Sequence, residues 1–80
     1  PIKTEERLMR LFELLCQRLG KRAIDGYLLE FLLPHARIAE IIGATRSTVS
    51  RSIGGLKRSE QIAIDEMRKE LIIPIGKETD

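Results

Sequence analysis

Hydroxyl and guanidinium side chains are concentrated in one short segment, residues 43–51, which reads GATRSTVSR. The segment holds two Thr, two Ser, two Arg and a single Val, and it contains no acidic residue. Arg can donate two hydrogen bonds to O6 and N7 of guanine, and Ser or Thr can reach bases or phosphates. The lack of carboxylates avoids repulsion from phosphate. These residue types favour non-covalent binding of a nucleic acid.

A helix over about residues 45–56 must position these side chains. Val49, Ile53 and Leu56 recur at i, i+4 and i+7 and form its apolar stripe. Thr45 is the expected N-cap and a candidate phosphate contact, because a helix N-terminus offers free N–H groups. The opposite face carries the candidate base-reading residues, which are Arg46, Ser47, Ser50 and Arg51. These side chains could also be plain solvated surface.

Two further polar residues keep alternative roles. Thr48 could cap or back-bond its helix, or touch a phosphate. His35 is the only histidine, and a metal site is not expected because the one cysteine is distant in sequence. We therefore interpret His35 as a surface residue or a phosphate contact, and we expect no metal.

A second helix is expected immediately before the first, from Pro34 to Gly43. Its apolar face consists of Ile38, Ala39, Ile41 and Ile42. Gly43 can adopt a positive φ, and only about three residues separate the two helices. This arrangement, over about residues 34–58, is a helix-turn-helix.

The flanking segments complete a small domain. Residues 4–19 form an amphipathic helix with Thr4 as N-cap and Gly20 as its stop. Its stripe consists of Leu8, Leu11, Phe12, Leu15 and Leu19. The stripe could pack on its own domain or on a partner, and we favour its own domain because so small a core needs it. Cys16 lies beside the stripe as a small buried hydrophobe.

Short β-segments are expected on both sides of the helix-turn-helix. Residues 27–33 read as a strand, paired with residues 22–24 as a hairpin, although a continued helix is the main alternative. Residues 61–75 read as a second hairpin, or wing, in which the β-rich runs QIAID and LIIPI flank the charged turn EMRKE. Pro74 indicates an edge strand or the end of pairing, and we expect the tail from Gly76 to fray. The predicted fold is mainly α with small β-hairpins, a winged helix-turn-helix over residues 1–80.

Charge and composition restrict the possible functions. The 80 residues carry a net charge of +2, but residues 34–58 hold five Arg or Lys and one Glu. A positive field in one segment favours a polyanionic partner. We find no run of about 20 apolar residues and no secretory signal, and a single cysteine favours a cytoplasmic protein. Because the chain begins with Pro1, we expect a fragment or a processed product.

The run HARIAEIIGATRSTVSR, followed by QIAID and ELIIPI, resembles the DNA-binding domain of the cyclic-AMP receptor protein and fumarate–nitrate regulator (Crp/Fnr) family of bacterial transcription factors. The spacing R-x-x-G-x-L over residues 51–56 is similar to global nitrogen regulators. The resemblance implies a winged helix-turn-helix in which Arg46, Ser47 and Arg51 read bases. It places Thr45, Thr48 and His35 at the phosphate backbone, with a wing near Arg68 and Lys69.

The resemblance also implies that full-length members are homodimers that bind two half-sites of a palindrome. Their N-terminal effector domain and long dimerisation helix are absent from these residues. Three departures from the family pattern stand out: Ser47 replaces Glu, Ser52 replaces an apolar residue, and the pair Gly54-Gly55 predicts a helix that ends or frays near Ile53. Pro34 also takes the place of a hydroxyl cap.

Two function classes remain. The first is sequence-specific binding of double-stranded DNA by a transcription regulator. The alternative is a winged helix used for protein–protein contact, since a fold does not fix a function. An enzyme is not expected, because no His, Cys or Ser arrangement has catalytic spacing, and no cofactor is expected in this segment.

Overall fold

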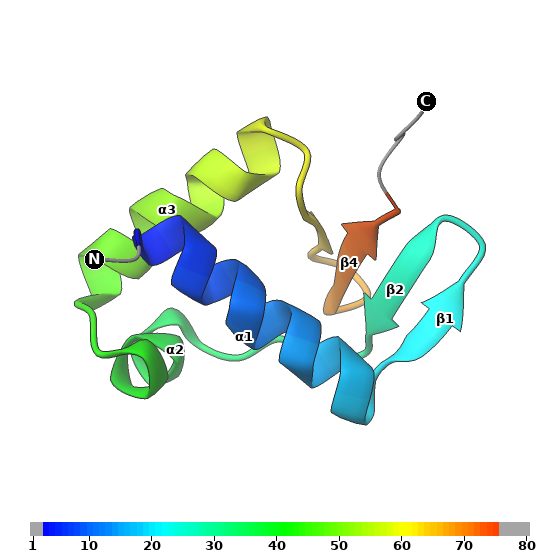
Figure 1. Cartoon of the computed structure of the whole chain (residues 1–80), viewed down its shortest axis with the longest axis horizontal. Helices are drawn as coiled ribbons and strands as arrows, with labels where there is room; N and C mark the ends of the chain where they lie inside the picture. The colour runs from blue at the N-terminus through cyan, green and yellow to red at the C-terminus, as the bar shows by residue number, and fades with distance from the viewer. Residues whose placement is uncertain (1–2, 76–80) are drawn as a thin grey trace.

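The computed structural model describes residues 3–75, and the predicted fraying of the tail lies outside them. The elements in chain order are α1 (Thr4–Leu19), β1 (Lys21–Ala23), β2 (Gly26–Leu29), α2 (His35–Ile42), α3 (Arg46–Arg58), β3 (Ala63–Asp65) and β4 (Glu70–Pro74). The helices lie together at one end of the molecule and the sheet at the other (Figure 1). The predicted winged helix-turn-helix fold is confirmed.

The two predicted hairpins join into one antiparallel sheet of order β1-β2-β4-β3. The joint is the pairing of β2 with β4, in which Gly26 lies opposite Pro74 and Leu29 opposite Leu71. Gly26 is required there because a Cβ would collide with the backbone carbonyl of Ile73. Since β4 has partners on both sides, Pro74 marks the end of pairing and not an edge strand.

The predicted strand over residues 27–33 is too long, because β2 ends at Leu29. Beyond Leu29 the chain has no partner strand in the register of the sheet. Phe31, Leu32 and Leu33 instead pack against the hydrophobic core as an extended link to α2. The competing prediction of a continued helix is wrong as well.

The core lies between the helices and the inner face of the sheet. Its buried members are Leu8, Phe12, Cys16, Leu29, Ile38, Ala39, Val49, Ile53, Leu56, Ile62, Leu71 and Ile73. The stripe of α1 therefore packs within its own domain, as predicted, although Leu19 is exposed at the end of the helix. Cys16 is buried as expected. Burial raises the pKa of its thiol, and the nearby Glu13 carboxylate raises it further.

Two predictions about helix ends are wrong. Lys3, not Thr4, is the N-cap of α1, because the Arg7 N–H already donates to the Lys3 carbonyl at 3.1 Å. Helix α3 does not end near Ile53 but continues through the glycine pair to Arg58. Burial of Ile53 and Leu56 on the same face holds this last part of the helix in place.

Glu60 ends α3 in a left-handed conformation, with φ of 63°. The Glu60 N–H donates to the Lys57 carbonyl at 3.1 Å, and the Gln61 N–H donates to the Leu56 carbonyl at 3.0 Å. This hydrogen-bond pair is the Schellman motif, whose left-handed position is usually glycine.

Replacing Glu60 with glycine is therefore expected to stabilise the domain by about 1 kcal/mol, because a left-handed residue with a Cβ is strained by that order. Urea unfolding followed by circular dichroism measures the change. Glu60→Ala is the matched control: it removes the same charge, keeps the Cβ and should give little gain. Equal stabilisation by both variants would assign the effect to charge and contradict the conformational argument.

Candidate nucleic-acid interface

The turn between α2 and α3 is fixed by hydrogen bonds at the end of α2. Gly43 has φ of 74°, and the Gly43 and Ala44 N–H groups both donate to the Ala39 carbonyl at 2.9 Å. The Arg7 guanidinium of α1 donates to the Ile42 carbonyl, which satisfies another free carbonyl of the helix end. No pattern in the sequence indicated this link between α1 and the turn.

The predicted apolar face of α2 is only partly confirmed. Ile38 and Ala39 are buried and Ile42 packs at the edge of the core, but the side chain of Ile41 is 52% exposed. Ala39 is 5% exposed, and its small side chain suits the close approach of α2 and α3. Val49 is fully buried and anchors α3 to the core, as the spacing predicted.

Thr45 is the N-cap of α3, as predicted. Its hydroxyl oxygen accepts a hydrogen bond from the Thr48 N–H at 3.2 Å. The Thr45 hydroxyl also donates to the Thr48 hydroxyl oxygen at 2.9 Å. Of the alternatives for Thr48, the structure therefore shows a contribution to the cap. The first turn of α3 contains no acidic residue, so its N–H groups stay free of a competing carboxylate.

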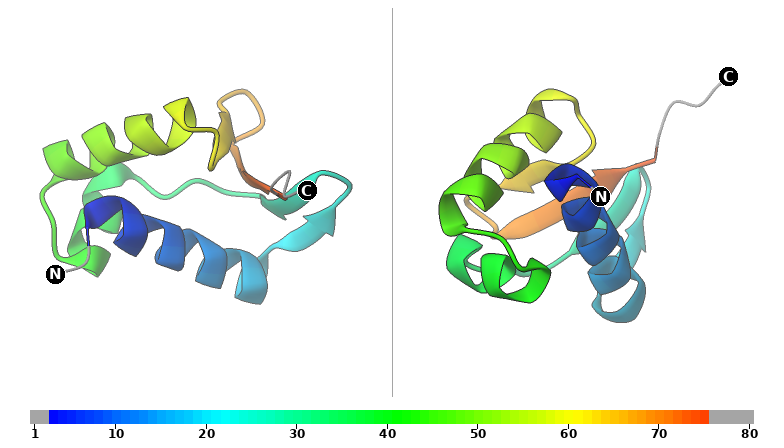
Figure 2. Two further views of the ribbon diagram at one scale, coloured as in Figure 1. Left: turned by 45° about the horizontal axis from the view of Figure 1, so that its top comes forward. Right: turned by 60° about the vertical axis from the view of Figure 1, so that its left-hand side comes forward.

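All four candidate base-reading side chains are exposed, namely those of Arg46, Ser47, Ser50 and Arg51. They form two adjacent rows along α3, because Arg46 and Ser50 are one turn apart and so are Ser47 and Arg51. Within residues 3–75, neither arginine takes part in an ion pair. Figure 2 shows that one long side of α3 is left uncovered by the other elements.

His35 is the first residue of α2, and its side chain reaches the middle of α3. The distance from His35 Nδ1 to Ser50 Oγ is 2.7 Å, which is a hydrogen bond between residues fifteen positions apart. The structure thus brings a predicted phosphate contact together with a predicted base reader. This pair was not predictable from the sequence, because only the crossing of the two helices creates it.

The other two predicted phosphate contacts, Arg68 and Lys69, are exposed in the turn between β3 and β4. The Asp65 carboxylate accepts hydrogen bonds from the N–H groups of Met67 and Arg68 at 3.1 and 3.0 Å, so it orders this turn. Lys69 has φ of 57°. In the described part of the chain, no hydrogen bond or ion pair joins Arg68 or Lys69 to α3.

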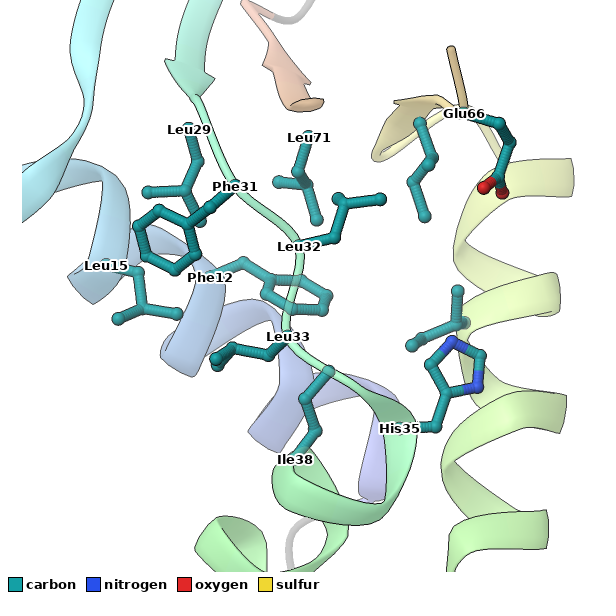
Figure 3. Close-up of a pocket in the computed structure, with 12 residues that line it drawn as sticks. Phe12, Leu15, Leu29, Phe31, Leu32, Leu33, His35, Ile38, Glu66 and Leu71 are labelled. Carbon is teal, nitrogen blue, oxygen red and sulfur yellow. The ribbon is translucent and has the colours of Figure 1, made fainter. Parts of the chain in front are cut away.

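A small cavity shows where the wing turn lies relative to the helices. Glu66 of the turn, His35 of α2 and Ile53 of α3 line this cavity together with apolar core residues (Figure 3). Its volume is about 100 Å³, far below the roughly 300–1,000 Å³ of small-molecule pockets. The cavity therefore does not fit a cofactor, but it places the wing turn beside the start of α2 and the middle of α3.

Residues 6–75 match the family model of the Crp-like helix-turn-helix domain. This chain belongs to the Crp-like helix-turn-helix family. The matched segment includes most of α1, all of α2 and α3, and both hairpins. The resemblance to Crp/Fnr regulators noted in the sequence is therefore confirmed.

Curated relatives agree with this membership. The Global nitrogen regulator of Synechococcus elongatus is 39% identical over 70 residues, which cover 88% of this chain and 32% of the relative. The Global nitrogen regulator of Nostoc sp. is 35% identical over 69 residues, which cover 86% of this chain and 31% of the relative. The chain thus spans about a third of the length of these relatives.

Solved structures show the same fold. Reduced CprK in the absence of any ligand superposes with a TM-score of 0.72 at 33% identity, covering 90% of this chain and 35% of that chain. The CO-dependent transcription factor CooA from Carboxydothermus hydrogenoformans superposes with a TM-score of 0.72 at 24% identity. The superposition covers 89% of this chain and 32% of the CooA chain. At that identity, CooA supports the fold alone. Within the described residues, no helix is long and apolar enough to cross a membrane.

Proposed function

We propose that this domain binds double-stranded DNA in a sequence-specific way, as the DNA-reading part of a Crp/Fnr-type transcription regulator. The observation that carries the proposal is the exposed face of α3, with two arginines and two serines and no acidic residue along the helix. A helix of this width fits the major groove, where every base pair presents a distinct pattern of donors and acceptors. In helix-turn-helix proteins the start of the second helix meets the base edges.

The candidate residues divide into two groups by their position. Arg46, Ser47, Ser50 and Arg51 are exposed along α3 and would read base edges. Thr45, Thr48 and His35 lie at the starts of α3 and α2, where they would contact the phosphate backbone. Arg68 and Lys69 of the wing turn would contact phosphates beside this groove, because the turn lies next to the same two helices.

The remaining features of the parent regulator are also proposals. Since the chain covers about a third of its curated relatives, a full-length regulator would add an effector domain and a dimerisation helix. A homodimer would place two copies of α3 in successive major grooves and select a palindromic site. We place such a regulator in the cytoplasm, where it meets its DNA.

Selection from a pool of randomised duplex DNA at moderate salt tests the proposal directly. Recovery of a palindrome would support specific reading by a dimer, and recovery of a short asymmetric motif would support reading by a monomer. No enrichment at any salt concentration would contradict the proposal and favour the alternative, a winged helix that contacts another protein. In that case, partner binding should survive removal of the Arg46 and Arg51 charges.

The affinity for the selected duplex is expected to fall steeply with salt. Each phosphate contacted by a basic side chain contributes a slope of about −0.9 to a plot of log affinity against log salt, because bound counterions are released. Replacing Lys69 with alanine should reduce the slope by about one and weaken all sequences alike. Titrations by fluorescence anisotropy at several salt concentrations measure both effects. An unchanged slope would remove Lys69 from the phosphate contacts.

A further inference from the structure

Ser50 differs from the other proposed base readers in one respect. Among the described residues, it alone of the four has a side-chain hydrogen bond within the protein, to His35 Nδ1 at 2.7 Å. A free serine hydroxyl can donate or accept, so it distinguishes poorly between base edges. A serine whose hydrogen is already directed at another group loses that freedom, and its preference then depends on which atom carries the hydrogen.

The direction of the hydrogen bond depends on the tautomer of His35. When the ring proton is on Nε2, Nδ1 accepts the Ser50 hydroxyl hydrogen, and only the oxygen lone pairs of Ser50 remain for DNA. When the proton is on Nδ1, the ring donates to Ser50, and the hydroxyl hydrogen stays available. The group that faces the other ring nitrogen decides between these two states.

The structure shows what lies on the other side of the ring. Figure 3 shows the His35 ring between the start of α2 and α3, and Glu66 of the wing turn lines the same cavity, although no hydrogen bond or ion pair joins these two side chains within residues 3–75. A DNA phosphate beside the start of α2 only accepts hydrogen bonds, and so does the carboxylate of Glu66 on the wing-turn side of the cavity. A phosphate contact at Nε2 therefore favours a proton on that nitrogen, which leaves Nδ1 as the acceptor for Ser50.

We propose that His35 is a positioning residue that fixes the Ser50 hydroxyl as an acceptor toward DNA. Ser50 then selects a base with an exocyclic amino group in the major groove, which is adenine through N6 or cytosine through N4. Guanine and thymine present only acceptors at these edges and are disfavoured. This inference rests on the proposed function, and it adds a specificity that depends on α2 and not on α3 alone.

The experiment first locates the base that Ser50 contacts. Wild-type protein and Ser50→Ala are compared on the same randomised duplex pool. We expect Ser50→Ala to lose its preference at one position, where the wild type selects adenine or cytosine on the contacted strand. Selection of guanine or thymine there by the wild type would overturn the proposal.

The second step removes the acceptor. In His35→Phe a ring remains but Nδ1 is lost, so the preference at the Ser50 position, expected to be about two- to tenfold for one hydrogen bond, should fall toward none. His35→Asn is the matched control, because its amide oxygen lies near the position of Nδ1 and should restore the preference. Preferences at the positions that depend on Arg46 and Arg51 should persist in both variants, which a general loss of structure would not allow.

The outcomes separate this inference from the function on which it rests. No enriched motif for the wild type would contradict DNA reading itself. An enriched motif with full preference at the Ser50 position in His35→Phe would contradict the role of His35 alone. If His35→Phe does not fold, as judged by circular dichroism, His35→Ala at this half-exposed position gives the same readout.

Discussion

Replacing Arg51 with alanine is expected to weaken binding to the selected duplex by about 1–3 kcal/mol, or roughly 5- to 150-fold. Arg51 is exposed in the middle of α3, one turn from Ser47, and makes no ion pair within residues 3–75. Its guanidinium is therefore free to form two hydrogen bonds with guanine. Because these bonds read a base, preference should relax at one position of the site while the salt dependence changes little.

The matched control is Arg22→Ala, which removes the same charge from a different part of the molecule. Arg22 lies on the edge strand β1, and its guanidinium is 5.2 Å from the centre of the Tyr27 ring. This strand is at the far end of the molecule from α3 (Figure 1). The control should bind within about twofold of the wild type, as expected for a screened charge at a distance. Equal losses in both variants would mean that net charge, and not base reading, determines affinity.

Replacing Leu56 with alanine is expected to lower the free energy of unfolding by about 2–5 kcal/mol. Leu56 is 0% exposed and belongs to the face of α3 that packs against α1. Removing its side chain leaves a cavity in a core that has only twelve buried apolar residues among residues 3–75. A domain of this size has a total stability of only about 4–12 kcal/mol, so the variant should be partly unfolded at physiological temperature.

Urea unfolding measured by circular dichroism tests this expectation. Met67→Ala provides the control, because Met67 is apolar but 92% exposed in the wing turn, and its removal should cost less than about 0.5 kcal/mol. A cost below about 1 kcal/mol for Leu56→Ala would show that α3 is not anchored through this residue. In that case, the exposed face of α3 would not be held in a fixed orientation.

Local features of the sequence were sufficient to predict helix α3 and the turn that precedes it. The i, i+4, i+7 spacing of Val49, Ile53 and Leu56 determined the buried face of α3, and Thr45 determined its start. Gly43 determined the turn, because its positive φ is a local property of the backbone. Once the buried face is fixed, the helical period places the arginines and serines on the opposite side. The composition of that face was therefore predictable, whereas its reading of DNA stays a prediction.

Contacts between distant residues decided the rest. The pairing of β2 with β4 joins residues more than 40 positions apart, and it ended β2 at Leu29 where the sequence predicted a longer strand. Burial of Leu56 extended α3 through two glycines whose helix propensity indicated fraying. The hydrogen bond between His35 and Ser50 depends on the crossing of two helices and has no pattern of its own in the sequence. Spacing thus determined which residues share a helix face, but only tertiary packing decided which of those side chains meet.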